Sequence, residues 1–286
     1  MIKRPIFQAA ADTWVISEFR LTSMYLLTGT KKALLIDTGF GCANLVRQIT
    51  ELTDLPLIAA ATHGHVDHAG GAGFFEEFYI SENDLQLVSD TISTKKRQNS
   101  IWGGCKRRSL PIPFDVEENV GDWIRTPVWK PLRDGDIIDL GGRAIRVIAL
   151  PGHTRGSMAF LDTKNRFLFS GDACNPNLLL AKPLGAGEAF DPSSENAVAK
   201  YAASVQTYLN SLTVLKSFSD QFDCNYIGHL DDFNQEPQTN DLIDELIRCC
   251  RNILSKGTSG GQIPNMPIKE TAGRASITYL PGQILS

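Results

Sequence analysis

Residues 62–71 of the chain read THGHVDHAGG, and four side chains able to bind a metal fall within six of these positions. The preceding residues 57–61, LIAAA, are typical of a short buried strand, and the glycines at the end of the stretch allow a sharp turn. Zinc prefers imidazole and carboxylate ligands at about 2.0–2.2 Å, so several such groups must converge on one point. Alternate residues of an extended segment point the same way, so His63 and His65 can share one ion. Asp67 and His68 can serve a second position beside it.

The remaining histidines also follow the ends of predicted strands. His153 follows the strand-like residues 145–150, and His229 follows residues 226–228. Asp172 also ends a strand-like run. All five histidines of the chain therefore lie at strand ends, whereas histidines that only fill a core or a surface would scatter over helices and loops. The distribution predicts a metal site.

This order of residues (His-x-His-x-Asp-His, a distant His, an Asp and a last His) resembles the pattern of the metallo-β-lactamase superfamily. The resemblance implies an α/β (α+β) fold, a four-layer αββα sandwich with two metals in a cleft between its sheet edges. It implies seven metal ligands: His63, His65, Asp67, His68, His153, Asp172 and His229. His63, His65 and His153 would hold one ion. Asp67, His68 and His229 would hold the other, and Asp172 would bridge the two ions. An early motif, residues 37–39, is also matched, and it implies that Asp37 orients the metal loop without binding the metal.

The bulk properties fit an ordinary globular protein. The chain has 286 residues, 42% of them hydrophobic, and a formal net charge of −4. No apolar run approaches the roughly 20 residues that cross a bilayer, and the first residues do not read as an export signal. We therefore expect a single domain over residues 1–286, a cytoplasmic location, a small-molecule substrate, and no nucleic-acid or membrane partner. A homodimer is left open.

Elsewhere the periodicity predicts strands followed by helices in two halves, which suits two packed sheets flanked by helices. Ser81 and Asp84 are spaced as a capping box, which would open a helix over residues 85–88. Residues 194–212 carry a helical pattern, and residues 174–192 read as a loop. Residues 90–130 read as the least regular part, an insertion that could fold over the cleft as a lid. Its basic and aromatic residues either select an anionic or amphipathic substrate or form a solvated charged loop that its tryptophans attach to the core.

A pair of metals about 3.5–4 Å apart can share a hydroxide, because metal binding lowers the pKa of water to about 7. Our leading interpretation is a dinuclear zinc hydrolase that uses this bridging hydroxide to cleave a small-molecule ester, thioester or lactone. Asp67 would act as a ligand whose free oxygen can also pass a proton to the leaving group. Among relatives, the sequence looks more like the glyoxalase II-like and lactonase-like branch than like a secreted β-lactamase.

Three alternatives stay open. The first is a persulfide dioxygenase of the same fold with one iron, since imidazole and carboxylate also suit iron or manganese. The second is a phosphodiesterase, and the third is a non-catalytic sensor or scaffold.

Overall fold

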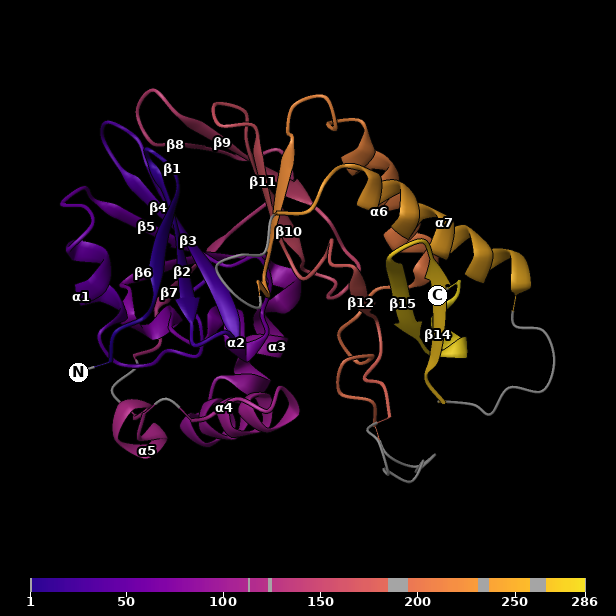
Figure 1. Ribbon diagram of the computed structural model, residues 1–286, viewed down its shortest axis with the longest axis horizontal. Coiled ribbons are helices and arrows are strands. Elements are labelled where there is room, and N and C mark those ends of the chain that lie inside the picture. Colours follow the sequence, from indigo (N-terminus) through magenta and orange to yellow (C-terminus); the bar gives the residue numbers. More distant parts are fainter. Residues whose placement is uncertain are drawn as a thin grey trace.

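The computed structural model describes residues 2–112, 114–122, 125–184, 195–230, 237–257 and 266–285 (Figure 1). Within these residues the strands form three sheets. The first sheet contains, in spatial order, β1 (Ile6–Ala10), β2 (Thr13–Glu18), β3 (Thr22–Thr28), β4 (Ala33–Ile36), β5 (Leu57–Ala60), β6 (Glu77–Ile80) and β7 (Val128–Pro131). The second contains β13 (Cys224–Ile227), β11 (Phe167–Gly171), β10 (Met158–Asp162), β9 (Ala144–Ala149) and β8 (Ile137–Asp139). The third contains β12 (Asn177–Leu179), β15 (Ala275–Tyr279) and β14 (Ile268–Ala272).

The two large sheets pack face to face through a shared apolar core. Strand β4 shows how the sequence achieves this, because successive side chains point to opposite faces. Leu34 and Ile36 join the core between the sheets, whereas Leu35 joins a cluster on the outer face of the first sheet. The second sheet contributes Val147 and Phe160 to the shared core. A strand buried on both faces needs a continuous apolar run, which residues 33–36 supply.

Helices cover the two outer faces. On the first sheet, α1 (Leu45–Thr50) buries Leu45 and Ile49 in the outer cluster. On the second sheet, α6 (Val205–Lys216) and α7 (Asp241–Lys256) pack against the face opposite the shared core, and the third sheet lies beside them (Figure 1). The short α2 (Val66–Ala69), α3 (Leu85–Thr91) and the 3-10 turns η1 (Ala72–Phe74) and η2 (Glu82–Asp84) join strands of the first sheet. The expected αββα order of layers is confirmed.

The structure corrects several local predictions. Residues 90–130 are not the least regular part, because they hold α4 (Thr94–Arg107) and α5 (Val116–Asn119); residues 113, 123 and 124 of that segment lie outside the described residues. The predicted loop 174–192 contains strand β12, and its residues 185–192 are not described. The helix predicted from residue 194 begins at Val205, because the Ser204 hydroxyl accepts a hydrogen bond from the Thr207 backbone N–H and caps it there. The last element in the described part of the chain is the 3-10 turn η3 (Pro281–Gln283).

No helix in the described part of the chain combines the length and the apolar character needed to span a bilayer.

A buried arginine ties the two large sheets together. Arg143, just before β9, pairs with Asp162 of β10 at 2.6 Å, and both side chains are inaccessible to solvent. The same guanidinium donates to Thr13 Oγ1 and to the carbonyl oxygens of Asp12 and Thr28, which belong to the first sheet and its turn.

We expect Arg143→Met to lower the free energy of unfolding by about 3–5 kcal/mol, because it removes the cation that pairs with the buried Asp162 carboxylate and leaves that carboxylate only the Lys164 backbone N–H. The measurement is urea unfolding at a fixed metal concentration. The double variant Arg143→Met, Asp162→Leu should recover most of the loss. Equal stability of the single variant and the wild type would contradict this account of the inter-sheet contact.

Candidate metal centre

The seven predicted ligands all follow carboxyl ends of strands. His63, His65, Asp67 and His68 come after β5, in the loop that leads into α2 and in α2 itself. The other three follow β9, β11 and β13 of the second sheet. Strands β9 and β11 are both antiparallel to β10, and β13 is parallel to β11, so these three strands run the same way and their carboxyl ends share one edge. Sheet topology therefore brings together residues that are up to 166 positions apart (229 minus 63).

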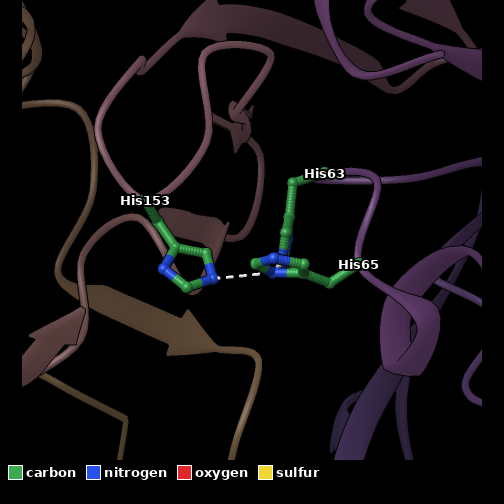
Figure 2. Close-up of side chains that lie close together, drawn as sticks. All are labelled: His63, His65 and His153. Atoms are coloured by element: carbon green, nitrogen blue, oxygen red, sulfur yellow. Dashed lines mark hydrogen bonds between the residues drawn. The ribbon is translucent and has the colours of Figure 1, made fainter. Parts of the chain in front are cut away.

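The side chains form three overlapping groups whose ligand atoms lie within 4.8 Å of one another. The groups are His63, His65 and His153; His63, His68 and Asp172; and Asp67, His68 and His229. In the first group, Nδ1 of His65 lies 3.0 Å from Nε2 of His63 and 2.9 Å from Nε2 of His153. Figure 2 shows these three imidazoles pointing toward one another, with His153 approaching from a separate segment.

Asp172 lies between the first and third groups. Its Oδ2 is 3.0 Å from Nε2 of His229 and 3.6 Å from Nε2 of His153, whereas its Oδ1 is 3.7 Å from Nε2 of His68. A carboxylate that reaches both groups has the placement a bridging ligand needs.

Two atoms of the cluster test whether the residues fit a metal. His68 Nε2 and Asp172 Oδ1 are buried without a hydrogen-bond partner among the described residues. A buried polar atom left unsatisfied costs about 1–3 kcal/mol, and a cation held between the two atoms would remove that cost. Gly228 also keeps the space beside these two side chains open, because a Cβ there would lie 2.5 Å from both Asp172 Oδ1 and His68 Cε1. The donor set of imidazole and carboxylate suits zinc, and it also suits iron or manganese.

Hydrogen bonds behind the cluster fix how the imidazoles present their nitrogens. Nδ1 of His153 lies 2.7 Å from the Leu179 carbonyl oxygen, and Nδ1 of His229 lies 2.7 Å from that of Leu21. A carbonyl oxygen only accepts, so each Nδ1 carries the proton and, in the neutral ring, each Nε2 offers its lone pair to the cluster.

Asp37 has the orienting place that the resemblance implies. Its Oδ2 lies 2.8 Å from His68 Nδ1 and accepts from Thr62 Oγ1, and its Oδ1 accepts from the Thr62 backbone N–H at 2.7 Å. It belongs to none of the three ligand groups found among the described residues.

The carboxylates set the protonation of the cluster. Burial opposes the charged form of His68, but Asp37, Asp67 and Asp172 outweigh it and raise the pKa of His68 to about 10. Burial and the neighbouring His153 lower the pKa of His65 to about 3. Burial acts to raise the pKa of Asp172, but the nearby His229 and His68 outweigh it and hold that pKa well below its ordinary value. In the metal-free protein His68 is therefore protonated at neutral pH, and His65 is neutral.

Asp84 is a residue that the sequence interpretation misplaced. The capping box is wrong, because Ser81 accepts from the Asn83 N–H and the Asp84 carboxylate turns away into the protein. That carboxylate accepts from Gly64 N–H at 2.8 Å, Gly156 N–H at 2.9 Å and Thr154 Oγ1 at 2.7 Å. It thus joins the loop between His63 and His65 to the loop after His153. Burial raises the pKa of Asp84 despite these donors. No spacing rule marks this role, since a helix start also favours Asp.

The cluster opens into a cavity of about 420 Å³. Four of the seven predicted ligands line it: Asp67, His153, Asp172 and His229. Leu21, Phe40 and Val66 give it an apolar side, and Ser100, Gly104 and Arg107 of α4 form another wall. The segment predicted as a lid therefore borders the cleft, and whether it closes stays a prediction.

Cys174, two residues beyond Asp172, is buried, and burial raises the pKa of its thiol to about 12, which disfavours the thiolate that a metal needs.

Comparison with known proteins identifies relatives of this chain. The family model described as "Metallo-beta-lactamase superfamily" matches residues 18–204. An acyl-coenzyme A thioesterase, MBLAC2, from Gallus gallus is 31% identical over 170 residues, which cover 52% of this chain and 56% of that protein. The hydroxyacylglutathione hydrolase GloC from Haemophilus influenzae is 26% identical over 159 residues, covering 55% and 68% respectively. The matched region spans little more than half the length of the thioesterase.

Among solved structures, a metallo-beta-lactamase family protein from Thermus thermophilus aligns with a TM-score of 0.54 and 21% identity, over 87% of this chain and 82% of that one. A metallo-beta-lactamase from Pontibacter korlensis aligns with a TM-score of 0.56 and 15% identity, over 87% of this chain and all of that one. At these identities the alignments show a shared fold.

The role of Asp84 is tested by Asp84→Asn, which keeps the shape but replaces an acceptor oxygen with a donor that faces N–H and O–H groups. We expect metal affinity to fall about 10–100-fold and the free energy of unfolding to fall by about 2 kcal/mol. Competition titration with a chromophoric chelator and urea unfolding measure the two effects. Glu82→Gln, exposed in the same 3-10 turn, is the matched control and should change neither. An unchanged metal affinity in Asp84→Asn would exclude the proposed link between the loops.

The raised pKa of His68 predicts a pH dependence of metal binding. A metal must displace the proton that His68 holds up to about pH 10, so affinity rises with pH below that value. We expect the apparent Zn²⁺ affinity to increase at least about tenfold for each pH unit between about pH 6 and pH 8. Proton release measured by calorimetry in buffers of different ionisation enthalpy is the check. A pH-independent affinity without proton release would show that His68 is neutral before the metal binds.

Proposed function

Because the chain belongs to the metallo-β-lactamase superfamily, we propose that it is a metal-dependent hydrolase of small-molecule thioesters, with two zinc ions in the cluster. The observation that carries the proposal is the convergence of seven imidazole and carboxylate groups with two buried, unpartnered ligand atoms. The names of two relatives, an acyl-coenzyme A thioesterase and a hydroxyacylglutathione hydrolase, support the thioester class over other esters.

The residues divide into two metal positions. His63, His65 and His153 would hold one ion, and Asp67, His68 and His229 the other, with Asp172 shared. Bound there, the ions supply water of lowered pKa as the nucleophile and stabilise negative charge that develops on the substrate. The carbonyl oxygens of Leu179 and Leu21 and the Asp37 carboxylate keep three of the imidazoles oriented.

Asp67 is the side chain with freedom to handle a proton. It lines the cavity, and its Oδ2 lies 3.6 Å from His229 Nε2 and 3.8 Å from His68 Nε2. The other carboxylate oxygen can accept a proton from the attacking water or pass one to the leaving group. A thiol has a pKa of about 8.5, so it departs as a thiolate with little assistance, and one modest proton carrier is sufficient.

The apolar side of the cavity suits the acyl part of such a substrate. Leu21 and Phe40 are buried in the protein, yet they reach the cavity beside Val66. Apolar contact there contributes about 25 cal/mol for each Å² of surface removed from water, which favours substrates with a hydrocarbon acyl chain.

The proposed bridging role of Asp172 is tested by replacing this residue with alanine. We expect Asp172→Ala to keep at most one zinc per chain and to lose thioester turnover by more than about 100-fold, because it removes the group shared by both positions. Elemental analysis and an assay of thiol release measure the two effects, with Asp220→Ala, an exposed carboxylate outside the cluster, as control. Two zinc ions and normal turnover in Asp172→Ala would refute the bridge. One iron per wild-type chain with persulfide-dependent oxygen uptake would instead favour the dioxygenase.

A further inference from the structure

The wall of the cavity formed by α4 has a chemistry that the metal cluster does not use. Ser100, Gly104 and Arg107 are spaced by four and three residues, so they share one face of the helix, and all three line the cavity. Gly104 allows close packing below this face, since a Cβ there would lie 3.1 Å from Leu21 Cδ2. The helix thus presents a hydroxyl and a guanidinium to the same space as the cluster.

Arg107 is the cation available on this wall. Its side chain is exposed, and it forms no ion pair or hydrogen bond with any residue that the structure describes. The neighbouring Arg108 also lines the cavity, but its guanidinium donates to the Arg20 carbonyl oxygen. Arg107 and Ser100 also line an adjoining hollow of about 300 Å³ that contains Lys96 and Asn99. Arg107 therefore borders both spaces.

Two asparagines add further donors from another wall of the cavity. The Asn175 Oδ1 accepts from the Asn177 backbone N–H at 3.0 Å, and the Asn177 Oδ1 accepts from Ser276 Oγ at 3.0 Å. Both amide oxygens are engaged, so the NH₂ groups are the side-chain donors that these two cavity-lining residues still have free to offer. The only carboxylates lining that cavity in the described part of the chain, Asp67 and Asp172, belong to the cluster.

We propose that this set of donors is a binding site for an oxyanion, a phosphate or carboxylate, carried by the thiol half of the thioester, and that Arg107 is its principal ligand. This inference rests on the proposed function and specifies its substrate class. A guanidinium matches both kinds of oxyanion through two parallel N–H···O contacts, and amide and hydroxyl donors complete the contact. The thiol half is the part addressed, because the apolar residues Leu21, Phe40 and Val66 take the acyl half.

A competing account is that Arg107 only balances the negative end of the helix dipole. Lys106 and Arg107 both stand in the last turn of α4, where cations are favourable. Lys106 is exposed and does not line the cavity, so Lys106→Gln removes the same charge from the same helix end without touching the site. It is the matched control for Arg107→Gln.

Calorimetry on the zinc-loaded protein separates the accounts. The probes are two pairs of S-methylated thiols, so that no free thiol competes for the metal. The first pair is 4′-phosphopantetheine against pantetheine, and the second is glutathione against its diethyl ester. We expect the wild type to prefer one anionic probe over its neutral partner by about tenfold or more. Arg107→Gln should abolish the preference, Lys106→Gln should keep it, and Arg107→Lys should keep part of it.

Each outcome decides the proposal. A preference in the first pair identifies a phosphate and one in the second identifies a carboxylate, and either supports the site if it depends on Arg107. The site is refuted if the wild type prefers neither anion, or if Lys106→Gln reduces the preference as much as Arg107→Gln. Thioester turnover is measured separately. Turnover without an Arg107-dependent preference leaves the hydrolase intact and removes the anion site, whereas the reverse result keeps the site and removes the hydrolase.

Discussion

The contact of the Asp37 carboxylate with His68 and Thr62 is the interaction on which the geometry of the candidate metal centre depends. Asp37 follows β4 and Thr62 follows β5, two parallel neighbours in the first sheet. The carboxylate is fully buried, so its cost of desolvation is offset only while these donors stay in place. Asp37 has a φ of 63°, a conformation unusual for a residue other than glycine, and the three donors hold it there. The loop that carries His63 and the helix that carries His68 are thereby fixed to one point.

Asp84 performs the same task on the other side of the cluster. Asp37 binds the loop after β5 to the first sheet, and Asp84 binds that loop to the one after β9 in the second sheet. The loops after β5 and β9 are thus held by two buried acceptors. This arrangement explains how a cluster of imidazoles that repel one another when protonated can be assembled before a metal arrives, and why the cluster sits where the two sheets meet.

Much of the fold and the cluster could be predicted because their signals are local. The run at residues 57–61 and the histidines at strand ends need only strand periodicity and ligand chemistry to be recognised. Helix α4 was missed because its buried face begins with Arg97, followed by Ile101 and Cys105. Arg97 replaces an apolar residue by donating to the carbonyl oxygens of Gly41 and Gly121, so a search for apolar spacing does not find it. The contacts of Asp84 and the proposed role of Arg107 come from tertiary placement alone, and no spacing in the sequence could indicate them. That the whole chain is one domain stays a prediction.

The groups that would perform the reaction and the groups that would select the substrate come from different elements of the fold. Groups that would hold the metals come from strand ends, where the sheets fix them, whereas the donors on α4 come from a segment inserted between β6 and β7. The protein carries a net charge of −4, so its overall field does not attract an anionic substrate. At physiological salt, charges beyond about 8 Å are largely screened, and only local cations can recruit one. Selectivity for the proposed anionic thiol would therefore come from groups on the cavity wall such as Arg107. It could change with α4 while the strand ends, and the hydrolysis they would support, stay the same.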